Sequence, residues 1–129
     1  MICKFLTAIL CFALAACGSS DVPKAEDPTP VLGCYKADEA PAILISRDDF
    51  TFEGGAHPLP FRYEFHKVGM MLAVPVSADT DGRQLVLRPS DDHFYRVLFD
   101  NSLPVIRVAF GPNGQLVDYR RTESRACAL

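Results

Sequence analysis

The sequence predicts an all-β domain, and three observations support that prediction. From about residue 31 onward, short runs of apolar residues alternate with polar residues at a period of two. Gly, Pro, Asn and Asp separate these runs, as in tight turns between strands. No run reads convincingly as a long helix. We therefore expect a small antiparallel meander that closes into a barrel, or folds into a sandwich, so that few strand edges stay exposed.

The chain before this domain has the three parts of a secretory signal peptide. Lys4 supplies the positive charge, residues 5–14 form an apolar stretch, and Ala15 and Ala16 are the small residues that precede a cleavage site. The apolar stretch is too short to span a bilayer. We therefore expect residues 1–16 to be a signal peptide that is removed.

The end of this segment, Leu14-Ala15-Ala16-Cys17, resembles the lipobox of bacterial lipoproteins in all four positions. The resemblance implies that the Cys17 thiol receives a diacylglycerol, that cleavage occurs before Cys17, and that the new amine takes a further acyl chain such as palmitate. Two or three acyl chains hold a small protein on a membrane firmly. Gly18 follows the cysteine, which by analogy with enteric bacteria favours the outer membrane and its periplasmic face. The alternatives are an ordinary cleavage site or an uncleaved apolar anchor.

Residues 17–30 are expected to be the lipidated cysteine and a flexible tether. The segment is rich in Gly, Ser, Pro and charge and has almost nothing to bury. The β domain is then expected to cover residues 31–129.

Two cysteines remain after Cys3 and Cys11 leave with the signal peptide and Cys17 takes lipid. Export places Cys34 and Cys127 in an oxidising compartment, so we expect one disulfide between the first and last elements of the domain. A metal or redox use is disfavoured because the chain has no Cys-x-x-Cys motif.

Nine strands are expected, each from one alternating run between turn residues. They lie near residues 34–36, 42–46, 50–53, 61–68, 70–76, 84–88, 94–99, 105–110 and 115–121. The segments Asp79-Thr80-Asp81-Gly82 and Gly111-Pro112-Asn113-Gly114 each suit a hairpin turn.

The run over residues 61–68 has the clearest two-faced pattern. It predicts that Phe61, Tyr63 and Phe65 point into the core. Its other face carries Arg62, Glu64 and His66, which are expected to face water and to be dispensable for folding. These three residues are the candidate binding residues, and the alternative is that they only keep the strand soluble.

Residues suited to catalysis or metal binding do not cluster in the sequence. His57, His66 and His93 have no spacing that places two on one face of one element. The chain also lacks a nucleophile elbow and a phosphate-binding Gly-rich loop. We expect no enzyme, no metal and no cofactor, and the net charge of −3 argues against nucleic acid as a partner.

The leading hypothesis is a non-enzymatic domain that binds a protein or another component of the envelope, such as the cell wall. One alternative is a carrier of a small apolar ligand, because Gly33-Cys34-Tyr35 resembles the Gly-x-Trp opening of lipocalins. Its expected lining is Phe61, Tyr63, Phe65, Met70, Met71, Phe94 and Phe99. The other alternative is an inhibitor: the signal, small β domain and single disulfide are similar to periplasmic inhibitors of C-type lysozyme, although their Ser-Gly-x-x-Tyr loop is absent. Its longest candidate loop is Gly54 to Leu59.

Overall fold

Nine strands and one short 3-10 helix make up the part of the chain that the computed structural model describes, residues 23–82, 84–123, 127 and 129. The expected signal peptide and Leu14-Ala15-Ala16-Cys17 lie outside these residues. The elements are β1 (Lys24–Ala25), η1 (Thr29–Val31), β2 (Gly33–Lys36), β3 (Ile43–Ile45), β4 (Phe50–Phe52), β5 (Arg62–His66), β6 (Gly69–Thr80), β7 (Leu85–Asp100), β8 (Leu103–Phe110) and β9 (Gln115–Arg121). None of the described helices is long and apolar enough to cross a membrane.

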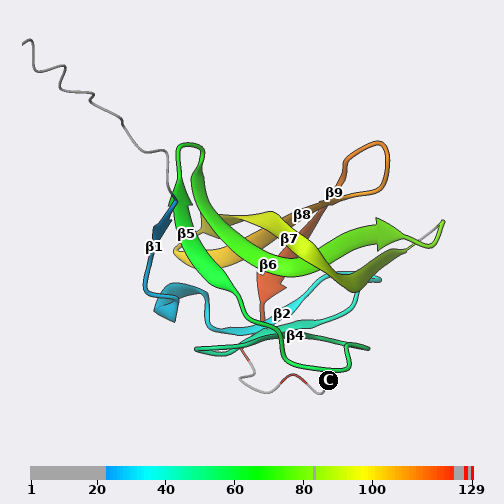
Figure 1. The fold of residues 1–129 in the computed structure, drawn as a ribbon, viewed down its shortest axis with the longest axis horizontal. Helices are drawn as coiled ribbons and strands as arrows, with labels where there is room; N and C mark the ends of the chain where they lie inside the picture. Colours follow the sequence, from blue (N-terminus) through cyan, green and yellow to red (C-terminus); the bar gives the residue numbers. More distant parts are fainter. Residues whose placement is uncertain (1–22, 83, 124–126, 128) are drawn as a thin grey trace, which may run out of the picture.

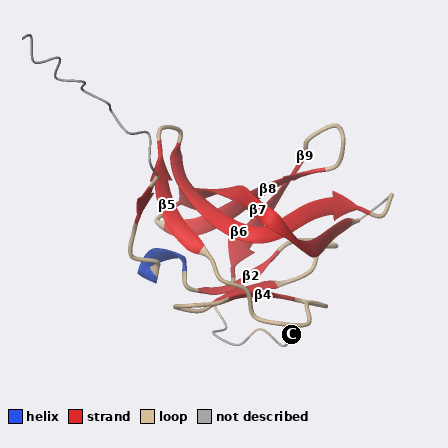
Figure 2. Ribbon diagram, viewed as in Figure 1, coloured by secondary structure: helices blue, strands red, loops and turns tan. Residues whose placement is uncertain are grey.

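The strands form one antiparallel sheet in the order β1-β5-β6-β7-β8-β9-β2-β3-β4. Two meanders, β5 to β9 and β2 to β4, are joined where β2 pairs with β9. The sheet curls into a half-barrel (Figure 1), and strands dominate the fold throughout (Figure 2). A bridge between Phe50 and Leu59 ties edge strand β4 to the segment that leads into β5. The predicted all-β, barrel-like class is confirmed.

One long strand, β7, replaces two of the predicted strands. Residues 84–88 and 94–99 were expected to be separate, because Pro89-Ser90-Asp91-Asp92 has the composition of a turn. These residues instead form a bulge, since Val76 pairs with Pro89 and Val74 pairs with His93. Pro is tolerated here because β8 pairs only with Arg96–Asp100, which leaves the first half of β7 as a sheet edge.

Part of the segment predicted to be a tether lies against the sheet. Lys24 and Ala25 pair with β5, and the Glu26 amide donates to the Tyr63 carbonyl at 2.7 Å. The helix η1 then places Val31 in the core, where it is fully buried. The domain therefore begins at Lys24 rather than at Val31.

The inner face of the curled sheet holds the hydrophobic core. Its buried residues are Val31, Tyr35, Ile43, Ile45, Phe50, Phe52, Tyr63, Leu72, Val74, Val76, Leu85, Leu87, Tyr95, Val97, Ile106, Val108, Phe110 and Tyr119. The Tyr35 hydroxyl donates to the Val31 carbonyl at 2.7 Å, and the Tyr95 hydroxyl donates to the Val76 carbonyl. Burial raises the pKa of both phenols, so they remain protonated donors.

The predicted disulfide between Cys34 and Cys127 is present, with the two Cα atoms 5.5 Å apart. It lies where β2 meets β9, and the Thr122 amide donates to the Cys34 carbonyl at 2.8 Å beside it. Gly33 starts β2 with a φ of 140°, and a Cβ there would lie 3.0 Å from Cδ of Arg121. A larger residue would therefore disturb the same junction.

Candidate functional site

Strand β5 has the predicted alternation, with two corrections. Tyr63 faces the core and is buried, and Phe61 is partly buried against the same core. Arg62, Glu64 and His66 share the outer face. Phe65 was expected to be core but is 54% exposed. It lies near the end of the β5–β6 hairpin, across from Met70, which is only partly buried against the core.

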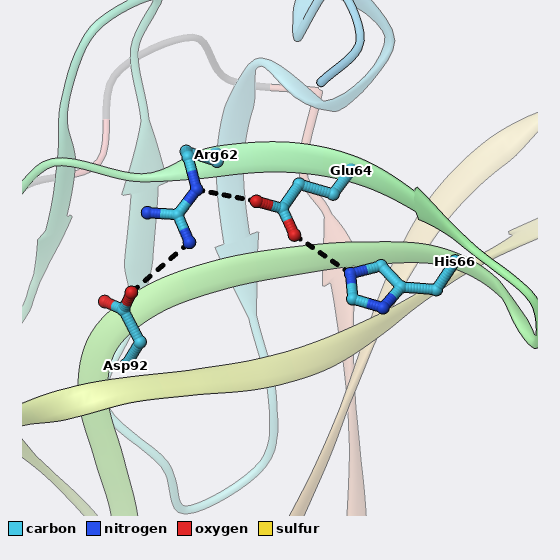
Figure 3. A network of polar contacts seen from close by, with 4 residues as sticks. All are labelled: Arg62, Glu64, His66 and Asp92. Carbon is cyan, nitrogen blue, oxygen red and sulfur yellow. Dashed lines mark hydrogen bonds and ion pairs between the residues drawn. The ribbon is translucent and has the colours of Figure 1, made fainter. Parts of the chain in front are cut away.

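Glu64, which was expected to face water, is only 5% exposed. Its carboxylate lies between the side chains of Arg62 and His66, as Figure 3 shows. Arg62 Nε donates to Glu64 Oε1 at 2.6 Å, and His66 Nε2 lies 2.9 Å from Glu64 Oε2. Because an ionised carboxylate can only accept, the imidazole donates through its Nε2–H. Both oxygens of Glu64 are thus engaged.

Asp92 completes this network from a second strand. Arg62 Nη2 donates to Asp92 Oδ2 at 3.2 Å, so one guanidinium joins two carboxylates. Asp92 lies in the bulge of β7, which interrupts the regular ladder opposite Pro75. The sequence analysis did not predict this contact of Asp92, because the contact depends on a bulge that periodicity does not reveal.

The two neighbours of Glu64 determine its protonation. Burial acts to raise the pKa of the Glu64 carboxyl, but hydrogen bonds and positive charge from Arg62 and His66 outweigh burial and lower that pKa. A lowered pKa in the folded state means that the ionised carboxylate stabilises the fold above the ordinary glutamate value. This contribution disappears as the pH falls through the folded pKa.

We expect Glu64→Gln to reduce stability at pH 7, because the charge-assisted bonds to Arg62 and His66 are lost. The difference in free energy of unfolding between wild type and Glu64→Gln should shrink between pH 5 and pH 3, as wild-type Glu64 becomes protonated. Urea unfolding across this pH range measures it. Asp48→Asn, an exposed change outside the network, is the control and should follow wild type at each pH. A difference that stays constant with pH would contradict the lowered pKa.

Strand register brings further outer-face residues to this network. Ala73 of β6 lies between Arg62 and Phe94, and Met71 lies across from Arg96. Phe94 is 51% exposed, and its ring meets His66 edge-on with centroids 5.2 Å apart. We call Arg62, His66, Met71, Phe94 and Arg96 the outer-face patch. The sequence analysis missed Met71, Phe94 and Arg96 as partners of this face.

Arg96 has no carboxylate partner among the described residues. Arg96 of β7 lies directly opposite Arg107 of β8, and like charges on directly opposed residues repel each other. Arg107 is compensated by Asp118, which accepts from Nε at 2.7 Å and from Nη2 at 2.9 Å. Arg96 has only the Val68 carbonyl, at 3.4 Å from Nη2. Its positive charge is therefore available to a partner.

The histidines, the residues expected to line a carrier cavity and the candidate inhibitor loop do not form a further site. His57 lies in the loop between β4 and β5, His66 in β5 and His93 in β7. The described residues contain no group of three or more His, Cys, Asp or Glu side chains that could hold a metal ion. The seven residues expected to line a carrier cavity do not enclose one space, because Tyr63 is core whereas Met71 and Phe94 lie on the outer face. The Gly54–Leu59 loop is tied to β4 through Phe50 and Leu59.

Searches against protein-family models, curated proteins and solved structures find no match to this chain.

Proposed function

We propose that this protein is a lipid-anchored component of the bacterial envelope whose β domain binds a partner protein through the outer-face patch. Cys17 carries the lipid, and the anchor lies in the outer membrane with the domain on its periplasmic side. The domain is a binding module and not an enzyme. The observation that carries the binding proposal is the half-exposed Phe94 ring beside an Arg62 and a His66 that are held in place by Glu64.

The composition of the patch supports binding. Aromatic residues and arginine dominate the energetics of protein interfaces, especially in clusters whose neighbours exclude water. Glu64 fixes the side chains of Arg62 and His66 before a partner arrives, which lowers the entropy lost on association. Uncompensated Arg96 next to Phe94 favours a partner that presents a carboxylate beside an apolar side chain.

The same geometry argues against catalysis at this site. A general base needs a pKa near the working pH. The pKa of the Glu64 carboxyl is lowered rather than raised, because its two oxygens accept hydrogen bonds from Arg62 and His66. The network therefore holds side chains in position instead of moving a proton.

Site-specific photocrosslinking in the bacterium tests the binding face. Benzoylphenylalanine at Phe94 should give a discrete crosslinked product with one identified envelope protein. Benzoylphenylalanine in place of Leu116, which is 61% exposed on the outer-face register of β9, should not give that product. Arg96→Ala should reduce the Phe94 product by about tenfold, which corresponds to the loss of roughly 1.4 kcal/mol of binding free energy. Equal products from both positions, or an unchanged yield in Arg96→Ala, would contradict the proposal.

A further inference from the structure

Exposed apolar side chains concentrate at one end of the sheet. Among the described residues, seven large apolar side chains are exposed, and four of them flank two turns. Phe65 and Val68 lie at the β5–β6 turn, whereas Phe99 and Leu103 lie at the β7–β8 turn. In an antiparallel meander alternate turns fall at the same end, and both turns lie on the left of Figure 1. We call these four residues the apolar end.

The opposite end of the meander is polar. The β6–β7 turn follows Asp79 and contains Asp81 and Gly82, and the β8–β9 turn is Gly111-Pro112-Asn113-Gly114. Leu116 is the one large exposed apolar residue described near these turns, and Phe94 and Leu129 lie elsewhere. The two ends of the sheet therefore differ in the apolar side chains that they expose, and exposed apolar side chains that gather at one end are candidates for a contact surface.

The N-terminal chain enters the domain at the apolar end. Lys24 pairs with Phe65, and β1 runs antiparallel to β5. Because β5 runs towards the β5–β6 turn, the N-terminal end of β1 at Lys24 lies on the side of that turn. The seven-residue step from Cys17 to Lys24 can reach at most about 25 Å when fully extended. A lipid on Cys17 would thus hold this end of the domain, and not the polar end, close to the bilayer.

Basic residues accompany the apolar end. Lys24 is largely exposed and its ammonium lies 3.7 Å from the Glu26 carboxylate, and Lys67 lies in the β5–β6 turn. Beside Phe99, Arg120 donates to the Asp100 carboxylate at 3.0 Å. Apolar side chains with Lys and Arg beside them are typical of surfaces that lie in the headgroup region of a bilayer with anionic lipids. The polar end has acidic residues at the corresponding place, namely Asp79 and Asp81.

We propose that the apolar end, Phe65, Val68, Phe99 and Leu103, rests in the headgroup region of the membrane that holds the Cys17 lipid. This inference rests on the proposed lipid anchor and extends it from a tether to a fixed orientation. The β6–β7 and β8–β9 turns then point away from the membrane. The outer-face patch stands on the side of the sheet, where a partner can reach it.

Fluorescence quenching by labelled lipids tests this orientation. The full chain with Val68→Cys is produced in a bacterium, purified in mature form, labelled with an NBD maleimide, and reconstituted in vesicles of phosphatidylethanolamine and phosphatidylglycerol. Leu103→Cys gives a second probe at the apolar end, and Asn113→Cys gives the control at the polar end. A nitroxide on carbon 5 of the acyl chain should quench the first two probes by about twofold or more, because interfacial segments lie only about 5–10 Å deep. The Asn113 probe should be unaffected.

The outcomes separate the inference from the anchor on which it rests. Mass spectrometry of each purified protein shows whether Cys17 carries acyl chains. An acylated protein whose Val68 and Leu103 probes are quenched no more than the Asn113 probe overturns the orientation and leaves the anchor intact. Probes that shift to the blue without quenching would mean that protein, and not lipid, covers this end, which also overturns it. A protein without acyl chains overturns the proposed anchor and the inference together.

Discussion

Replacing Cys34 and Cys127 together with Ala is expected to lower the free energy of unfolding by about 4 to 5 kcal/mol. The disulfide spans 93 residues, and in the chain-entropy model a loop of roughly a hundred residues gives about this effect. The bridge also reinforces a short junction, since β2 and β9 pair through Tyr35 with Arg121 and Lys36 with Arg120, and the Thr122 amide donates to the Cys34 carbonyl beside them. Without the disulfide, this short ladder is the main connection between the two meanders.

Urea unfolding of the oxidised wild type and of the double Ala variant measures this effect. Reductant should destabilise wild type to the level of the variant and leave the variant unchanged, which controls for the loss of the side chains themselves. A difference below about 1 kcal/mol would show that the junction is held by packing alone, because disulfides closing long loops typically contribute about 2 to 4 kcal/mol.

Phe50→Ala is expected to destabilise the domain by about 3 to 5 kcal/mol, the usual cost of removing a fully buried ring. Phe50 is completely buried, pairs with Ile45, and forms the bridge to Leu59 that ties β4 to the segment before β5. Its loss would leave a cavity beside the bridge that ties β4 to the segment before β5.

Phe65→Ala is the matched control, because it deletes the same side chain from an exposed position. We expect a change within about 0.5 kcal/mol, as for other surface substitutions. Thermal or urea unfolding of the two variants side by side decides the assignment. Comparable destabilisation by both would mean that Phe65 is core, as its alternation with Tyr63 suggested, and would contradict the structure.

The sequence predicted the fold class well because the relevant signals are local. Alternating residues define a strand, and Asp81-Gly82 and Asn113-Gly114 define turns, without any knowledge of distant parts of the chain. Cys34 and Cys127 were predictable as a pair because only two cysteines remained once the N-terminal ones were assigned. Long-range order was not predictable in this way, so the pairing of β2 with β9 and of β1 with β5 had to come from the structure.

Alternation along β5 predicted the face of each side chain but not its exposure. Glu64 is on the predicted outer face, yet it is buried, and its carboxylate is hydrogen-bonded by Arg62 and His66. Phe65 is on the register of the core, yet it is exposed next to the end of β5. Asp92 joins the site through a bulge among turn-forming residues, which a period-two pattern cannot represent.

Metabolic labelling with palmitate tests the central claim most directly, because both the anchor and the orientation depend on Cys17. Wild type should incorporate label into a species processed before Cys17. Cys17→Ala should incorporate none and should accumulate as the unprocessed precursor, because no thiol remains to receive diacylglycerol. A Cys17→Ala protein that still carries label, or a wild type that carries none, would contradict the account.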